Sequence, residues 1–231
     1  MKTSFLLSLI LSFSSIIPFT IVRAQSEDSI AASKNLPYNK TLTIVYDLKI
    51  EGIKKTGIEE VYNGGNKTIF INNEKIRVRL VSLMRIESIF FNLTADTANN
   101  HVTIVKESGK DRYKNKLLWS EWKLYNSKYA GVHCQLDKDT RTILDYPCKK
   151  ATLKLLDGKE IIVYYTTQFY NPLLIEADPL FALVPGLVLQ YQYKRKGKSI
   201  TYTASQLSEN KISKNLFFIP GKDYPIKSFK L

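Results

Sequence analysis

The sequence has little of the chemistry that most enzymes and metal sites use. Its 231 residues include two histidines, two cysteines, two methionines and two tryptophans. His101 and His133 stand in no metal-ligand spacing, and neither a phosphate-cradling glycine loop nor a nucleophile elbow occurs. We therefore predict a protein that is not an enzyme, with no catalytic residue, no metal site and no cofactor.

Two short patterns keep a chemical alternative open. His133 precedes Cys134, which is one feature of a thiol catalyst, but neighbours on a strand point to opposite faces. Asp137, Asp139 and Asp145 could bind Ca²⁺, yet they lack the regular spacing of a calcium loop and are more typical of a turn.

Long apolar runs are absent after residues 1–24. In that first segment, Lys2 precedes an apolar run from Phe5 to Val22, and short residues end the run at Ala24. This pattern indicates a signal peptide that is cleaved near Ala24–Gln25. A membrane anchor is the alternative, which the serines and the proline within the run weaken. We expect a mature protein that is periplasmic or secreted.

Acidic residues are fewer than basic ones, 21 against 34, and the formal net charge is +13. In an exported chain this excess indicates attraction to anionic lipid or polysaccharide rather than to nucleic acid. The alternative is a basic surface that only confers solubility. The lysines are scattered and cluster only at Lys194–Lys198. We predict no nucleic-acid partner and an anionic membrane surface as a candidate partner, and leave the oligomeric state open.

The chain is rich in short runs in which apolar and polar residues alternate. Leu42, Ile44 and Tyr46 form one such run, and turn signals recur roughly every 8–12 residues. About ten or eleven strands are expected, with no repeat and no linker. We predict a mainly β fold in which residues 25–37 are flexible and residues 38–231 form one domain. Strands of this number can form a barrel, a sandwich or an open half-barrel. We predict the last of these, a single curved antiparallel sheet with short helical or irregular segments over its concave face.

The central hairpin is predicted around Asp157-Gly158, a dipeptide that suits a tight type I′ turn. Pairing across that turn places Leu153 opposite Ile162 and brings Tyr164 to the same face. Alternation in three regions then predicts the apolar concave face. Its expected members are Leu42, Ile44, Tyr46, Leu153, Ile162, Tyr164, Leu189 and Tyr191.

Two segments interrupt the β pattern. Leu117–Tyr125 carries both tryptophans at a spacing of three, which predicts a short helix or an irregular plug. Gln168–Pro185 holds three prolines, and Asp178 is predicted to cap a helical turn over Pro179–Leu183. We expect the part around Phe181 to lie over or beside the concave face.

The two cysteines, Cys134 and Cys148, lie on consecutive predicted strands. A lone pair of cysteines commonly bonds in an oxidising compartment. We predict a disulfide between them.

Thr142–Ala151 reads TILDYPCKKA and is followed by the strand that ends at Tyr165-Thr166. This stretch resembles "tIlGYkCkKA" of the GLPGLI family of Bacteroidetes exported proteins. Leu183–Val188 matches the namesake motif at its central Pro-Gly-Leu and departs from it at the first two positions. Phe218–Pro220 is similar to the closing motif.

This resemblance implies an exported envelope protein with the half-barrel of the periplasmic lipoprotein carriers, in which inner helices cover a site for acyl chains. No catalytic residue is established for the family. Together with the alternation, the resemblance predicts a lipid-like or apolar ligand. The candidate contact residues are Tyr46, Leu153, Ile162, Tyr164, Phe181, Leu189 and Tyr191. The alternative is an envelope scaffold or interaction module whose hollow is filled by its own side chains.

Overall fold

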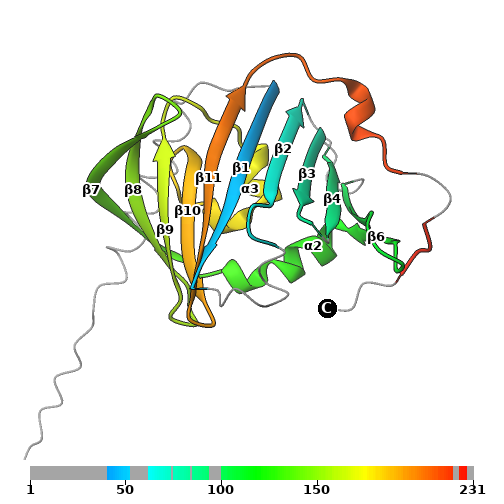
Figure 1. Ribbon diagram of the computed structural model, residues 1–231, viewed down its shortest axis with the longest axis horizontal. Helices are drawn as coiled ribbons and strands as arrows, with labels where there is room; N and C mark the ends of the chain where they lie inside the picture. Colours follow the sequence, from blue (N-terminus) through cyan, green and yellow to red (C-terminus); the bar gives the residue numbers. More distant parts are fainter. Residues whose placement is uncertain are drawn as a thin grey trace, which may run out of the picture.

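Eleven strands form one antiparallel sheet in the computed structural model, which describes residues 41–52, 62–73, 75–83, 85–93, 100–220 and 224–227 (Figure 1). The predicted signal peptide and the predicted flexible segment lie outside these residues. The strands are β1 (Thr41–Glu51), β2 (Asn66–Asn72), β3 (Lys75–Val81), β4 (Ile86–Asn92), β5 (His101–Lys106), β6 (Tyr113–Leu118), β7 (His133–Ile143), β8 (Tyr146–Lys154), β9 (Glu160–Thr166), β10 (Leu187–Arg195) and β11 (Lys198–Ser208).

The strand order is β6-β5-β4-β3-β2-β1-β11-β10-β9-β8-β7. One meander, β1 to β6, therefore runs outward from the centre, and a second, β7 to β11, runs inward from the other edge until β11 pairs with β1. The chain passes from one edge of the sheet to the other between β6 and β7, through the helix α2 (Trp119–Tyr125) and the 3₁₀ turn η3 (Ser127–Tyr129). Figure 1 shows this connection running along the lower end of the sheet.

Three irregularities in the strand pairing bend the sheet. The register shifts between Val45 and Tyr46 where β1 meets β11, between Val188 and Gln190 where β10 meets β9, and between Leu136 and Thr140 where β7 meets β8. A bulge of this kind bends its strand and increases the local twist. The sheet accordingly curves into an open half-barrel, and the predicted fold class is confirmed.

Side chains along each strand point alternately to the two faces of the sheet, and those on the concave face form the core. In β1 the side chains of Leu42, Ile44 and Tyr46 are buried, while those between them are half-exposed. The helix α2 buries Trp119 and Trp122 against the same core. The prediction of a short helix in this segment is thus confirmed.

The predicted turn of the β8–β9 hairpin is wrong. The Leu155 N–H donates to the Lys159 carbonyl at 2.9 Å, and the Gly158 N–H donates to the Leu155 carbonyl at 3.0 Å. The loop therefore has three residues, of which Gly158 alone has a positive φ, +78°. A type I′ turn would need positive φ at both Asp157 and Gly158. The observed arrangement is the three-residue loop with glycine in the left-handed position.

The extra loop residue shifts the strand pairing by one position. Leu153 pairs with Ile161 rather than with Ile162, and Ala151 pairs with Val163 rather than with Tyr164. A shift of one residue moves every side chain of a strand to the other face. Ile162 and Tyr164 therefore lie on the convex face, and their predicted place on the concave face is corrected.

The predicted disulfide is also wrong, because both cysteines are free. Cys134 and Cys148 do lie on adjacent strands, but Cys134 pairs with Leu153 and Cys148 with Arg141. The two thiols are thus separated by five residues along β8, or about 17 Å at the rise of an antiparallel strand. A disulfide joins Cα atoms that lie within about 7 Å of each other.

Candidate functional site

The segment between β9 and β10 covers the concave face. It contains the helix α3 (Leu173–Ala177) and the 3₁₀ turn η4 (Pro179–Phe181), which are seen behind the sheet in Figure 1. The indole N–H of Trp122 donates to the Glu176 carbonyl at 3.0 Å, which fixes α3 to α2. The prediction that the proline-rich segment lies over this face is confirmed.

The segment returns to the sheet at Gly186, where the backbones approach closely. A Cβ atom at this position would lie 2.3 Å from the carbonyl oxygen of Thr166. Only glycine fits there, since real Cβ atoms do not come within 3.0 Å of other heavy atoms. The central Pro-Gly of the sequence motif therefore sets how the segment rejoins β10.

A buried ion pair joins this segment to β2. The ammonium of Lys67 lies 3.0 Å from a carboxylate oxygen of Asp178, and only 11% of the Lys67 side chain is exposed. The predicted helix cap at Asp178 is wrong, because its side chain makes no cap hydrogen bond and binds Lys67 instead. Burial opposes the charge of Lys67, but the nearby Asp178 and Tyr46 keep the pKa of its ammonium above the usual value.

Aromatic rings surround this ion pair. The Lys67 ammonium lies 5.8 Å from the ring centre of Tyr46 and 5.3 Å from that of Tyr191. The ring of Tyr191 stacks on Tyr202 with centres 4.7 Å apart, and Phe181 packs against it at 5.2 Å. Such aromatic and cation–π contacts fix the positions of the rings.

The tyrosines of this cluster stay neutral. Burial raises the pKa of Tyr46 and of Tyr191 well above the usual value, and it raises the pKa of Tyr193 to about 12. The hydroxyl of Tyr46 donates a hydrogen bond to the Val188 carbonyl at 2.7 Å. These hydroxyls therefore keep their protons, and remain able to donate, at physiological pH.

Two hollows meet at Asp178 and Phe181, which line both. The inner one is a small apolar cavity of about 50 Å³ between β1, β2 and α3. The outer one is a groove of about 520 Å³ at the end of the sheet that carries the β8–β9 and β10–β11 hairpins. The groove is lined by Lys128, Tyr129, Leu155, Asp157, Lys159, Ile161, Asp178, Leu180, Phe181, Tyr191, Tyr193, Lys194, Arg195 and Tyr202.

No family model matches the sequence, and no curated protein matches it. Among solved structures, the chain is similar to MucB with a TM-score of 0.48 and 10% identity, over 88% of this chain and 66% of that chain. It is similar to PNGF-II with a TM-score of 0.46 and 19% identity, over 82% of this chain and 32% of that chain. This chain thus spans about a third of the length of PNGF-II.

A third likeness is to the lipoprotein LppX of Mycobacterium tuberculosis, with a TM-score of 0.39 and 13% identity. It covers 84% of this chain and 98% of that chain. None of these likenesses carries a function over to this chain.

The structure brings three of the seven predicted contact residues to the hollows. Tyr46 lines the inner cavity, Tyr191 lines the groove, and Phe181 lines both. Leu153 and Leu189 are fully buried in the core and line neither of these hollows.

The remaining two predicted contact residues are far from both hollows. Ile162 and Tyr164 are half-buried on the convex face. There the guanidinium of Arg141 lies 3.6 Å from the ring centre of Tyr164. This stacking explains an aromatic residue on the outer side of the sheet without any ligand.

Sequence reasoning missed Lys67 and gave Asp178 the role of a helix cap instead of a partner in an ion pair. Lys67 lies on the concave face together with Ile69 and Ile71, so a charged residue in an apolar alternation was the available signal. Tyr193 and Tyr202 also line the groove, and nothing local in the sequence indicates that a groove opens beside them.

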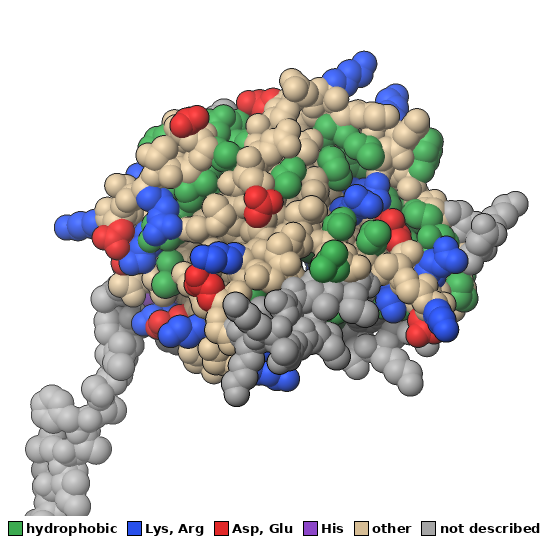
Figure 2. Space-filling model, in the orientation of Figure 1, with side chains coloured by type: hydrophobic (Ala, Val, Ile, Leu, Met, Phe, Trp, Pro, Cys, Tyr) green, Lys and Arg blue, Asp and Glu red, His purple; other side chains and the backbone are tan. Residues whose placement is uncertain are grey.

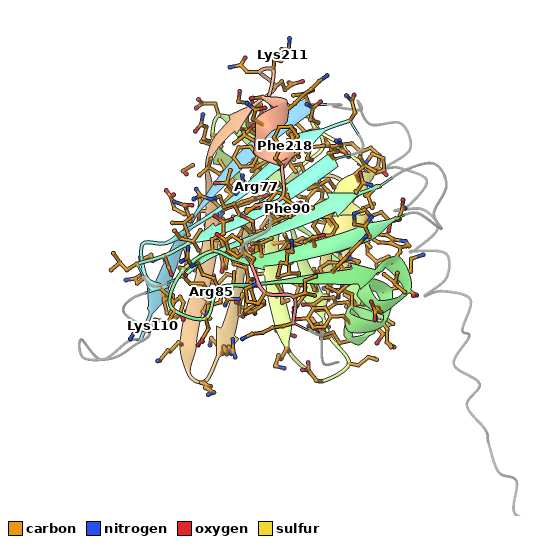
Figure 3. All side chains as sticks on the ribbon, turned by 90° about the vertical axis from the view of Figure 1, so that its right-hand side faces the viewer. Arg77, Arg85, Phe90, Lys110, Lys211 and Phe218 are labelled. Atoms are coloured by element: carbon orange, nitrogen blue, oxygen red, sulfur yellow. The ribbon has the colours of Figure 1, made fainter. Side chains whose placement is uncertain are left out.

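The convex face has its own buried polar cluster, under the 3₁₀ turn η5 (Lys214–Phe217). Arg77 forms an ion pair with Glu107 at 3.3 Å, donates to the Ser88 hydroxyl at 2.9 Å and donates to the Leu216 carbonyl at 3.1 Å. Its guanidinium also lies 5.0 Å from the ring centre of Phe90 (Figure 3). Each partner is satisfied within the cluster, which fastens the segment after β11 to the sheet.

The described part of the chain contains no group of three or more His, Cys, Asp or Glu residues that could hold a metal ion. In the same residues, no helix is both long enough and apolar enough to span a bilayer. On the face seen in Figure 2, basic and acidic side chains are interspersed and form no single basic patch.

Proposed function

We propose that this is an exported envelope protein that binds a lipid-like or apolar ligand in the groove of its half-barrel and catalyses no reaction. The observation that carries the proposal is the groove of about 520 Å³ beside Phe181. Small-molecule sites typically measure about 300–1,000 Å³ and combine an apolar lining with a few placed polar groups. The volume of the groove lies in this range, and its lining combines apolar residues such as Leu155, Ile161 and Leu180 with tyrosines and six charged side chains.

The lining suits an apolar chain. Leu155, Ile161, Leu180 and Phe181 supply aliphatic and aromatic surface, and the tyrosine rings add more. Burying a methylene group gains about 0.8 kcal/mol, so a chain of modest length supplies enough free energy for micromolar binding. The resemblance to the GLPGLI family, and through it to the lipoprotein carriers, points to the same class of ligand.

A scaffold without a ligand is the second candidate. The inner cavity of about 50 Å³ favours it, since most of the concave face is filled by the protein's own side chains. Leu153 and Leu189, for example, are fully buried. The two candidates differ in whether the outer groove takes up an apolar molecule.

Binding of the uncharged fluorescent probe N-phenyl-1-naphthylamine tests the proposal. We expect a saturable rise in fluorescence with the unmodified protein. Tyr193→Asp should abolish that rise, because the new charge would have to be desolvated in the groove. Tyr164→Asp is the matched control, since it makes the same change on the convex face.

Probe binding that is lost in Tyr193→Asp but kept in Tyr164→Asp supports the groove as the site, provided that both variants unfold cooperatively. If the unmodified protein binds no probe, the proposal of an apolar ligand is wrong and the protein is better described as a scaffold without a ligand. Equal losses in the two variants would place binding outside the groove.

A further inference from the structure

The charges around the groove do not balance. Its lining contains four basic residues and two carboxylates, and both carboxylates already have a partner. Asp178 pairs with Lys67, and Asp157 pairs with Lys159. Among the described residues, Lys128, Lys194 and Arg195 of the lining form no ion pair.

Two of these cations, Lys128 and Arg195, line the groove from different elements. Arg195 ends β10, where alternation puts it on the same face as Tyr191 and Tyr193. Lys128 belongs to η3, and its ammonium lies 4.2 Å from the ring centre of Tyr125. Both side chains are exposed, whereas the apolar lining residues Leu155, Ile161, Leu180 and Phe181 are half-buried or buried. The exposed side of the groove is its mouth.

The uncharged polar groups of the groove are donors as well. Within the described residues, the hydroxyls of Tyr193 and Tyr202 donate no hydrogen bond, and burial raises the pKa of both. A phenol that keeps its proton can donate to an acceptor. The mouth therefore offers a guanidinium, an ammonium and phenolic hydroxyls, with its carboxylates already engaged.

We propose that the groove selects an anionic amphipath, whose carboxylate or phosphate head binds between Arg195 and Lys128 and whose apolar chain extends toward Phe181. This inference rests on the proposed function and names the class of ligand. A carboxylate, like a doubly ionised phosphate, only accepts hydrogen bonds, which matches a mouth built from donors. A neutral head of the same chain length gains none of the charge-assisted contacts.

Displacement of bound N-phenyl-1-naphthylamine by three ligands of equal chain length tests the inference. The ligands are decanoate, decyl phosphate and decan-1-ol, used below their aggregation limits at neutral pH and low salt. We expect at least one of the two anions to displace the probe at about tenfold lower concentration than the alcohol. High salt should reduce that preference, because exposed charges are screened.

The variant Lys128→Gln/Arg195→Gln should lose most of the preference while it still binds the probe. Its control is Lys211→Gln/Lys214→Gln, which removes the same net charge from exposed positions. Figure 3 shows Lys211 at the far end of the sheet from the hairpins. The control should retain the full preference.

The outcomes separate this inference from the proposed function. Equal displacement by all three ligands would overturn the inference and leave the apolar site intact. An equal loss in both double variants would overturn the assignment to Lys128 and Arg195, since net charge alone would then explain the preference. Failure of the probe and of every ligand to bind would overturn both. Displacement by only one anion identifies whether carboxylate or phosphate is the favoured head.

Discussion

Replacing Asp178 with asparagine leaves the buried ammonium of Lys67 without its counter-ion while the size of the side chain is kept. Breaking a buried ion pair from one side costs about 3–5 kcal/mol when the remaining charge is fully enclosed. Here 11% of the Lys67 side chain and 29% of the Asp178 side chain are exposed, so solvent partly compensates. We expect Asp178→Asn to lower the free energy of unfolding by about 2–3 kcal/mol.

The opposite change should cost less. Lys67→Met leaves Asp178 unpaired, but the more exposed carboxylate can hydrate, and the methionine keeps the apolar contacts with Tyr46 and Tyr191. We expect Lys67→Met to lower the free energy of unfolding by about 1 kcal/mol or less. Because Lys67→Met also removes the buried charge, the double variant should be close to that single variant, so the coupling between the two sites should be about 2–3 kcal/mol.

Urea unfolding followed by the fluorescence of the two buried tryptophans, Trp119 and Trp122, measures these differences. The reasoning is refuted if Lys67→Met destabilises the protein as much as Asp178→Asn does. It is also refuted if the two changes are additive, since the residues would then not interact.

The pH dependence of the free energy of unfolding gives an independent check, because the pKa of Lys67 shifts in opposite directions in the unmodified protein and in Asp178→Asn. In the unmodified protein the pKa of Lys67 is raised, so its contribution is complete below the unfolded pKa of about 10.5 and is lost as pH rises through the folded value. In Asp178→Asn burial acts without the counter-ion and lowers that pKa, so folding releases a proton. The difference in the free energy of unfolding between Asp178→Asn and the unmodified protein should therefore shrink between neutral pH and about pH 9.5, before the tyrosines ionise.

Three further predictions concern the register, the thiols and the partition between the hollows. Val163→Asp should lower the free energy of unfolding by more than about 3 kcal/mol, whereas Ile162→Asp on the convex face should lower it far less. Similar losses for the two variants in urea unfolding would contradict the observed register. Thiol titration of the unfolded, unreduced chain should give two free thiols, Cys134 and Cys148, and a count of zero would contradict the strand pairing. Phe181→Ala should join the two hollows and shift the preferred acyl chain to a longer one in probe displacement; an unchanged length optimum would show that Phe181 does not divide them.

The class of the fold was readable from the sequence because alternation is a local property. Leu42, Ile44 and Tyr46 alternate with half-exposed residues, so burying one face of β1 needs no knowledge of its neighbours. The spacing of Trp119 and Trp122 is also local, and it predicted a short helix or an irregular plug, of which the structure has the helix. The number of strands followed from the spacing of the turns.

The pairing of β8 with β9 was not readable in the same way. Asp157-Gly158 fits both a two-residue turn and the last two positions of a three-residue loop, and one residue separates the two outcomes. That single residue decided on which face Ile162 and Tyr164 lie. The bulge near Leu136 likewise set the pairing of Cys134, and with it the distance to Cys148.

The candidate site itself was decided by tertiary structure. Lys67 and Asp178 are 111 positions apart in the chain, and a buried charge is tolerated only where the fold supplies its partner. Lys128 and Arg195 meet at one groove because the chain crosses from one sheet edge to the other through η3. Alternation sorts residues between two faces of a strand, but the elements that close over a face are brought there by contacts between distant segments.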